Sequence, residues 1–378
     1  MLRFLTAGES HGKALVGMIE GLPAGMPVSR ETVDQDLARR QKGYGRGGRM
    51  SIEKDRIEIL SGLRGGMTLG SPVSFIINNR DYQNWEQGMD PFEGDLSYRP
   101  VIHPRPGHAD LSGALKYGFS DVRHVLERSS ARETAVRVAV GSLVGQMLNP
   151  FGIVAVSHVI QIGSVAMHGE RYSFEALQRA ENSPVRCVNS AKETEMMQEI
   201  DDAAARGDSL GGVIEVQVRG VPVGLGSHVQ WDRKLDARLA YALMSIQAIK
   251  GVEVGDGFAA AEKSGSLVHD EIYHEEHRGY FRKTNHAGGI EGGISNGETL
   301  ILRCAMKPIP TLMQPLRTVN INSKEPYMAA KERSDTCAVP AAAVVAEMVT
   351  LFVLGQAFME TFGRDSFEEM KRCWKPWK

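Results

Sequence analysis

Apolar and polar residues alternate along several short stretches of the chain, and a period of two is typical of strands that bury one face. Glycine-rich polar segments separate these stretches and have the composition of turns and loops. The pattern predicts strands at about residues 56–60, 72–77, 152–156, 213–218 and 299–305. A further strand is expected to end near residue 7, where the chain enters a glycine-flanked turn.

Elsewhere apolar residues recur every three or four positions, which is the period of a helix with one buried face. Because helices and strands are interleaved, the sequence predicts an α+β fold, and no stretch within residues 1–378 has the composition of an interdomain linker. The helices are expected at about residues 29–41, 131–148, 191–205, 232–250 and 341–362.

Two features concern the longer-range order of these elements. Residues 129–156 and 234–254 share a plan of polar lead, long helix and strand, which is a hint of internal pseudo-symmetry. Between residues 262 and 289, charge, histidine and glycine replace the apolar rhythm. That segment is therefore expected to be a mobile loop.

The charge balance and the cysteines exclude several classes of protein. Lysine plus arginine (44) nearly equal aspartate plus glutamate (46), so no bulk field is present that would gather nucleic acid or an anionic membrane. The four cysteines are far apart and show no C-x-x-C spacing, which argues against a disulfide framework and a structural zinc site. A reducing cytoplasm fits this pattern.

Neither the N-terminus nor the interior predicts a targeting or membrane segment. The first residues lack the apolar core and cleavage site of a secretory signal. The longest apolar stretch, residues 338–352, is interrupted by Pro340 and Glu347 and is expected to be too short to span a bilayer. The sequence thus predicts a soluble, cytoplasmic protein.

Two early segments carry candidate chemistry. The sequence GESHG at residues 8–12 presents His11 on a tight turn, where it could exchange a proton near neutral pH, although a structural histidine is an equal alternative. Residues 39–49 combine five cations with four glycines, which suits a phosphate or carboxylate unless the loop is merely solvated. A G-x-G-x-x-G match at residues 43–48 follows a helix pattern and opens none, so a Rossmann site is discarded.

Two further segments combine rigid backbone with polar groups. The first is HPRPGHAD at residues 103–110, whose His103, His108 and Asp110 could be read as metal ligands. Their spacing matches no standard set, and Arg105 would repel a cation. A bound anion beside a histidine that acts as an acid fits better. In RSSARET at residues 128–134, Ser129 or Ser130 could cap a helix, with Glu133 completing a capping box. The same helix start would also bind a phosphate.

The later polar segments are less specific one by one. Glycine-rich or proline-rich backbone with one or two polar groups could cradle a ring and a phosphate chain. His269, His274 and His277 have a spacing that could suit a metal, but their charged surroundings and the missing H-E-x-x-H favour a solvated loop. No metal site is expected. The cradle segments are residues 245–251, 285–297, 307–311 and 333–337.

Taken together and in this order, the segments resemble the chorismate synthase family along nearly the whole chain. The resemblance implies a single-domain β-α-β sandwich with internal pseudo-symmetry, assembled as a homotetramer. It also implies a lyase that converts 5-enolpyruvylshikimate 3-phosphate to chorismate and phosphate by anti-1,4-elimination with reduced FMN. The motifs that carry it are residues 8–12, 105–110, 128–134, 285–297, 307–311 and 333–335.

Carried over residue by residue, the resemblance implies catalytic roles for three side chains. His11 would protonate or stabilise the reduced flavin, His108 would assist departure of phosphate, and Asp335 would act with flavin N5 in removing the proton from C6. FMN would be held by Arg128, Ser129, Ser130, Gln247, Ala248, Gly292, Lys307, Pro308, Ile309, Pro310, Thr311 and Arg333.

Arg40 and Arg46 match positions assigned to NADP in the family, and NADPH is a candidate reductant. The substrate bears two carboxylates and a phosphate, so an arginine-rich pocket is expected, and the basic loop suits the substrate at least as well as a dinucleotide. An NADPH-dependent flavin oxidoreductase and a phosphate-ligand binding protein are the alternative functions. The substrate candidates are Arg46, Arg49, Arg105, Ser130 and Arg132.

Overall fold

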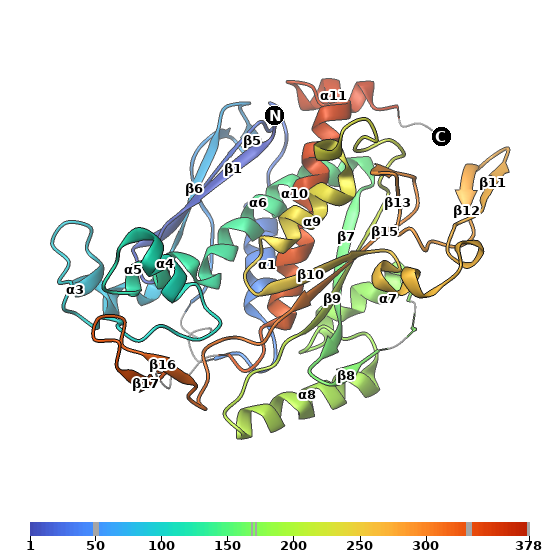
Figure 1. The fold of residues 1–378 in the computed structure, drawn as a ribbon. Helices are drawn as coiled ribbons and strands as arrows, with labels where there is room; N and C mark the ends of the chain where they lie inside the picture. Colours follow the sequence, from blue (N-terminus) through green and yellow to red (C-terminus); the bar gives the residue numbers. More distant parts are fainter. Residues whose placement is uncertain (48–52, 168, 171, 330–334, 376–378) are drawn as a thin grey trace.

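Two antiparallel sheets enclose a layer of helices in the computed structural model, which describes residues 1–47, 53–167, 169–170, 172–329 and 335–375 (Figure 1). The first sheet has the order β1 (Arg3–Ala7), β2 (Ala14–Glu20), β6 (Val73–Asn78), β3 (Glu58–Ser61). The second has the order β10 (Ile249–Val254), β15 (Leu300–Met306), β9 (Gly212–Arg219), β7 (Val154–Ile162), β8 (Val165–Ala166). The helices between them are α1 (Arg30–Gln41), α6 (Thr134–Leu148), α9 (Leu235–Met244) and α10 (Val339–Phe362).

The order of these elements repeats within the chain. The first half runs β1, β2, α1, β3, β6, α6, and the second runs β7, β9, α9, β10, β15, α10. In both sheets the strands then lie side by side in the equivalent order, and all these pairs are antiparallel. Internal pseudo-symmetry is therefore present. The predicted pair of segments, residues 129–156 and 234–254, was wrong, because these segments contain α6 and α9, whereas α6 corresponds to α10 and α9 to α1.

The central helices α6 and α10 pack closely because glycines let their backbones approach. A Cβ on Gly141 would lie 2.3 Å from the Met348 carbonyl oxygen, and one on Gly355 would lie 2.2 Å from a methyl carbon of Val144. Side chains larger than hydrogen have no room at these two positions. This contact joins the two halves of the chain at the centre of one hydrophobic core.

Helix α10 is long and apolar enough to cross a membrane, so the expectation that the stretch is too short was wrong. It has 24 residues, and 89 % of its most apolar window is buried inside the protein. A helix that is hydrophobic all round and covered on all sides is typical of a large protein core. Burial, rather than length, identifies α10 as a core helix.

Shorter elements make up much of the rest of the described part of the chain. The remaining helices are α3 (Glu86–Met89), α4 (Asp110–Tyr117), α5 (Arg123–Ser129), α7 (Phe174–Leu177), α8 (Ser190–Ala205) and α11 (Phe367–Cys373). Two-stranded hairpins are β4–β5 (Leu63–Arg64, Met67–Thr68), β11–β12 (Ile272–Glu275, Gly279–Arg282), β13–β14 (Ile290–Glu291, Ile294–Ser295) and β16–β17 (Arg317–Val319, Pro326–Met328). The 3-10 helices are η1 (Arg80–Asn84), η2 (Ala131–Glu133), η3 (Asn149–Phe151), η4 (Gln178–Asn182), η5 (Trp231–Arg233), η6 (Gly257–Glu262) and η7 (Gly265–Leu267).

The six predicted strands and five predicted helices are all present, with differences at their ends. The helix expected to reach residue 250 ends at Met244, because the chain turns through Ala248, whose φ is +67°, and enters β10. The segment 262–289, expected to be a mobile loop, instead contains the hairpin β11–β12. Cross-strand ring contacts between His274 and Tyr280 help to order this hairpin.

A row of polar residues crosses the second sheet. His158 of β7 and Arg303 of β15 both contact Glu215 of β9, at 3.3 and 2.8 Å. Burial alone would raise the pKa of the Glu215 carboxyl, but the hydrogen bond and charge of His158, with Gln217 and Arg303, lower it to about 2. Glu215 is therefore a stabilising carboxylate at neutral pH.

Candidate active site

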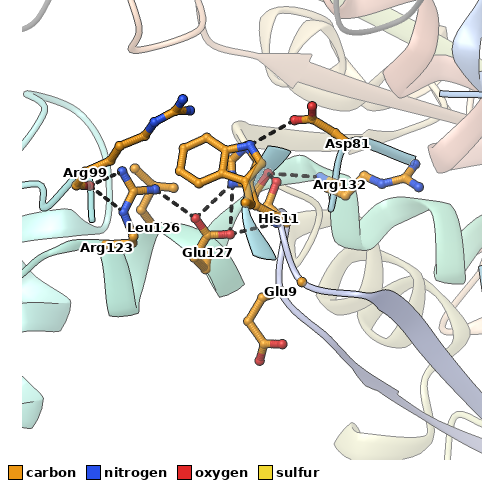
Figure 2. A network of polar contacts seen from close by, with 12 residues as sticks. Glu9, His11, Asp81, Arg99, Arg123, Leu126, Glu127 and Arg132 are labelled. Carbon is orange, nitrogen blue, oxygen red and sulfur yellow. Dashed lines mark hydrogen bonds and ion pairs between the residues drawn. The ribbon is translucent and has the colours of Figure 1, made fainter. Parts of the chain in front are cut away.

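His11 lies in the β1–β2 turn, and a buried carboxylate holds it there (Figure 2). The Glu127 side chain of α5 accepts the His11 backbone N–H at 2.8 Å and lies 2.9 Å from His11 Nδ1. Arg123 Nη1, one helical turn away, lies 3.1 Å from the same carboxylate. These contacts fix the β1–β2 turn to α5, which ends at Ser129 within the RSSARET segment.

An aromatic platform covers the His11 ring. The Trp85 indole lies with its centroid 4.2 Å from the imidazole, and the guanidinium groups of Arg99 and Arg123 lie 4.7 and 4.8 Å from that indole. Asp81 accepts the indole N–H at 3.0 Å. These contacts restrict rotation of the imidazole and place two cations nearby.

The pKa of Glu127 reflects these neighbours. Burial by itself would raise the pKa of the carboxyl, but the hydrogen bonds and charge of His11, followed by the charge of Arg123, lower it below the usual range. Glu127 is therefore an anion at neutral pH, and it accepts every hydrogen bond that it makes.

A second buried carboxylate joins α1 to η2, the 3-10 helix that leads into α6. Asp55 accepts from Arg40 Nη2 at 2.9 Å and from Arg132 Nη1 at 2.7 Å, and its side chain is fully buried. Arg132 Nε also donates to Asn79 Oδ1 at 2.9 Å. Asn79 in turn donates to the backbone carbonyl of Gly12 at 2.7 Å. The buried ion cluster therefore positions the turn that carries His11.

The arginines of this cluster repel one another, although Asp55 and also Glu53, which lies 3.7 Å from Arg132 Nη2, oppose that repulsion. Burial, together with repulsion from Arg132 and Arg46, outweighs the attraction of Asp55 and lowers the pKa of Arg40 to about 10. Asp55 has a lowered pKa because the charges of Arg40 and Arg132 outweigh its burial. A region where arginines repel one another favours an incoming anion.

Arg46 and Asp335 meet beside this cluster. Arg46 Nη1 lies 3.2 Å from Asp335 Oδ2, and the Gly47 N–H donates to Asp335 Oδ1 at 2.6 Å. The Gly45 carbonyl accepts the Thr336 N–H at 2.7 Å, so the basic loop and the start of α10 are joined through backbone as well. Two segments that lie 288 residues apart thus place a carboxylate against a guanidinium.

His108 has surroundings that resemble those of His11. Its Nδ1 lies 2.5 Å from Asp110 Oδ1, and Arg105 Nε donates to Asp110 Oδ2 at 2.8 Å. Burial alone would raise the pKa of Asp110, but the hydrogen bonds from His108 and Arg105 and the charge of Arg105 lower it well below its usual range. Arg105 Nη1 reaches Thr311 at 3.2 Å.

Contacts link the candidate cofactor residues to these histidines. Ser130 accepts a hydrogen bond from Ser10, next to His11, at 3.1 Å, and Arg128 donates to Thr6 and to the Gly8 carbonyl in the same turn. Gln247 donates to Glu133 at 3.2 Å. The Ala248 carbonyl accepts the Lys307 N–H at 3.0 Å, and Lys307 Nζ donates to the carbonyl of Gly107, next to His108. Together with the covalent bonds between neighbouring residues, these contacts form a continuous path from Ser10 to His108.

These contacts come from both halves of the fold, and sequence comparison identifies what the fold is. A family model for chorismate synthase matches residues 2–359. The chain belongs to the chorismate synthase family. It is an enzyme of that family, because relatives named chorismate synthase match it over its full length.

Two of these relatives are close. The chorismate synthase of Alkaliphilus metalliredigens is 62 % identical over 375 residues, which cover 99 % of each chain. That of Desulforamulus reducens is 59 % identical and covers 100 % of this chain and 98 % of its own. A crystal structure of a chorismate synthase superposes with a TM-score of 0.79 at 44 % identity and covers 98 % of this chain and 96 % of its own. The predicted α+β sandwich is thereby confirmed.

Not every residue implied by the chorismate synthase resemblance joins the cluster. Gly292 lies in the turn of the β13–β14 hairpin, which is well apart from α5 in Figure 1. Ser129 donates its hydroxyl to the Val125 carbonyl at 2.8 Å within α5, and Ile309 accepts from Ser209 at 2.7 Å. Arg49 and Arg333 lie outside the described residues. Pro308 and Pro310 flank Ile309 on the same loop as Lys307.

The RSSARET segment differs from its prediction. Arg128 and Ser129 end α5 instead of preceding one long helix, and Ser130 caps η2 by accepting the Arg132 N–H at 3.3 Å. The capping box is wrong, because the Glu133 side chain bonds Thr6, at 2.9 Å, and also Arg137 and Gln247. The serines therefore lie at a junction of two helices.

Sequence reasoning missed Glu127, Asp55, Asn79 and Trp85. Glu127 directly precedes the recognised segment, and its spacing of four from Arg123 was the available signal. Asp55 precedes β3 and Asn79 directly follows β6, and only the tertiary structure brings these two positions together. In the described part of the chain no group of three or more histidine, cysteine or acidic side chains could hold a metal. The side chains of His269, His274 and His277 are exposed.

Proposed function

We propose that this protein is a lyase of aromatic amino acid biosynthesis that converts 5-enolpyruvylshikimate 3-phosphate to chorismate and phosphate by anti-1,4-elimination, using reduced FMN. The observation that carries the proposal is the network that joins both histidine–carboxylate pairs to a cluster of buried arginines. The substrate is a small molecule with three anionic groups, and its elimination needs a proton at the leaving phosphate and a base at C6. The network contains groups for each need.

The arginines hold the substrate in this proposal, and other groups move protons. Arg46 and Arg105 are the candidates for direct contact, because their side chains are 11 % and 14 % exposed, whereas Arg40 and Arg132 are about 6 % exposed and already bound to Asp55. His108 donates a proton to the leaving phosphate. Asp335 takes part in removing the C6 proton.

The residues fit a flavin mononucleotide. Gln247 Oε1 is buried and has no hydrogen-bond partner among the described residues, and such an acceptor suits an N–H of a flavin ring. Lys307 and Arg128 supply cations, and Ser130 supplies a hydroxyl, for a phosphate. Reduced FMN, when bound, would lend electron density that weakens the C–O bond and would recover it afterwards, with no net redox change. His11 stabilises the reduced form.

NADPH as a reductant is a separate proposal. Of the two residues implied for it, Arg40 is 6 % exposed and held by Asp55, which favours a structural part for Arg40. The proposal for a dinucleotide contact therefore depends on Arg46.

We also propose a single domain that assembles as a soluble, cytoplasmic homotetramer. One cluster of buried residues runs through both sheets, which supports a single domain. On the outer face of the first sheet, Leu5 is 73 % exposed and pairs across strands with Met18, which is 43 % exposed. An apolar sheet face of this kind supports self-association.

The decisive experiment mixes purified protein with chemically reduced FMN and 5-enolpyruvylshikimate 3-phosphate under anaerobic conditions. We expect phosphate and chorismate to be released in equal amounts. Phosphate is measured by a phosphate assay and chorismate by its absorbance. Binding without turnover would refute the lyase. Steady NADPH oxidation without the substrate would instead favour a flavin oxidoreductase.

A further inference from the structure

The same arrangement of three side chains occurs twice in the candidate site. A buried carboxylate lies against Nδ1 of a histidine, and an arginine binds the same carboxylate. In both cases the histidine side chain is 16 % exposed and the carboxylate at most 3 % exposed. The two sets are His11 with Glu127 and Arg123, and His108 with Asp110 and Arg105.

A carboxylate can only accept, so each Nδ1 must carry the hydrogen. In a neutral imidazole the other nitrogen, Nε2, is then the acceptor. When the imidazole gains a second proton, Nε2 carries it, and this is the proton that His108 can release to a leaving phosphate.

We propose that Glu127 and Asp110 are positioning residues that fix the Nδ1–H tautomer of His11 and His108, so that Nε2 is the nitrogen that exchanges the proton. The inference rests on the proposed roles of the two histidines. Each carboxylate also fixes the ring in space through backbone, because Glu127 accepts the His11 N–H at 2.8 Å and Asp110 accepts the Arg105 N–H at 3.1 Å.

Amide variants would reverse the tautomer. The Glu127 carboxylate serves three donors, namely the His11 N–H, His11 Nδ1 and Arg123 Nη1. The backbone N–H binds Oε2, whereas Oε1 accepts from Arg123 Nη1 and lies 2.9 Å from Nδ1. A glutamine has one acceptor oxygen, and when that oxygen keeps the backbone donor, its NH2 replaces Oε1, faces Nδ1 and favours the Nε2–H form. Asp110→Asn has the same consequence, because the oxygen is needed by Arg105 N–H and Nε.

The test combines histidine NMR with kinetics on the full-length protein. In the 15N-histidine-labelled parent, His11 and His108 are expected as Nδ1–H tautomers. Glu127→Gln should convert only His11, and Asp110→Asn only His108. Turnover with reduced FMN should fall about 10²–10⁴-fold in each variant, the usual contribution of a positioned acid or base, while the Michaelis constant changes little.

A matched control is available outside the site. Asp256 Oδ2 lies 2.7 Å from His286 Nδ1, in the same geometry. Asp256→Asn should convert the His286 tautomer and leave turnover unchanged.

Three results would overturn the proposal. They are an unchanged tautomer in either site variant, a converted tautomer with parental turnover, and a loss of turnover in Asp256→Asn as large as that in the site variants. A parent enzyme that releases no phosphate would refute the proposed function, whereas the spectra would still decide the tautomers.

Discussion

Replacing Asp55 by asparagine perturbs the buried charge cluster beneath the candidate site. The side chain is fully buried, and its neutralisation removes the carboxylate that Arg40 and Arg132 share, while Glu53 stays 3.7 Å from Arg132 Nη2. At an effective dielectric constant of about 20, a charge pair about 4 Å apart is worth about 4 kcal/mol. Removing one partner of a buried ion pair typically lowers the free energy of unfolding by about 3–5 kcal/mol. We therefore expect Asp55→Asn to lower the free energy of unfolding by about 3–5 kcal/mol.

Urea unfolding, extrapolated linearly to water, measures this loss. The matched control is Glu360→Gln, because Glu360 is 51 % exposed and pairs with Arg238 on the surface. An exposed pair of this kind contributes less than about 1 kcal/mol. If Asp55→Asn loses no more than this control, the cluster does not stabilise the fold and the electrostatic reasoning is wrong. Because Arg132 orients Asn79, the variant should also raise the Michaelis constant for the substrate.

Four further outcomes are expected. His108→Ala and His11→Ala should each lower turnover about 10²–10⁴-fold while flavin and substrate binding persist, and parental turnover would refute the assigned roles. Arg46→Ala should raise the substrate dissociation constant at least tenfold in equilibrium binding, and an unchanged constant would place the basic loop outside the pocket. The lowered pKa of Glu215, about 2 against 4.5, contributes about 3 kcal/mol that is present above pH 4.5 and lost as pH falls towards 2, and urea midpoints of Glu215→Gln should show less of this acid sensitivity than the parent. Gly141→Ala should lower the free energy of unfolding by about 1–3 kcal/mol through overpacking against α10, whereas an alanine at Gly265, where the nearest atom lies 3.4 Å from the added Cβ, meets no such clash.

The elements that the sequence predicted are those with a strong local period. Helix α8 and strand β9 were placed within one residue of their observed ends, since their buried faces recur regularly along the chain. The hairpin β11–β12 was missed because its strands are four residues long and Phe281 is their one buried residue. A strand with little buried surface leaves no apolar rhythm to detect.

Residues of the candidate site were also predictable only where a local motif marks them. His11, Arg105 and His108 could be recognised because each lies in a motif of restricted backbone. Asp55 could not, because its role depends on Arg40 and Arg132, which approach it only when α1 and α6 pack together. A buried carboxylate in the sequence resembles any other acidic residue until its partners are placed around it.

The duplicated order of strands and helices gives the candidate site two unlike halves. The connections after α1 and after β6 carry Arg46 and His108, and the equivalent connections after α9 and after β15 carry Gln247, Lys307 and Asp335. Contacts such as Lys307 Nζ with the Gly107 carbonyl join the two sets. In the proposed function, a ligand between them would meet proton donors mainly from one repeat and cofactor contacts mainly from the other. An asymmetric substrate would then be bound in one orientation only, although the order of strands and helices around it is duplicated.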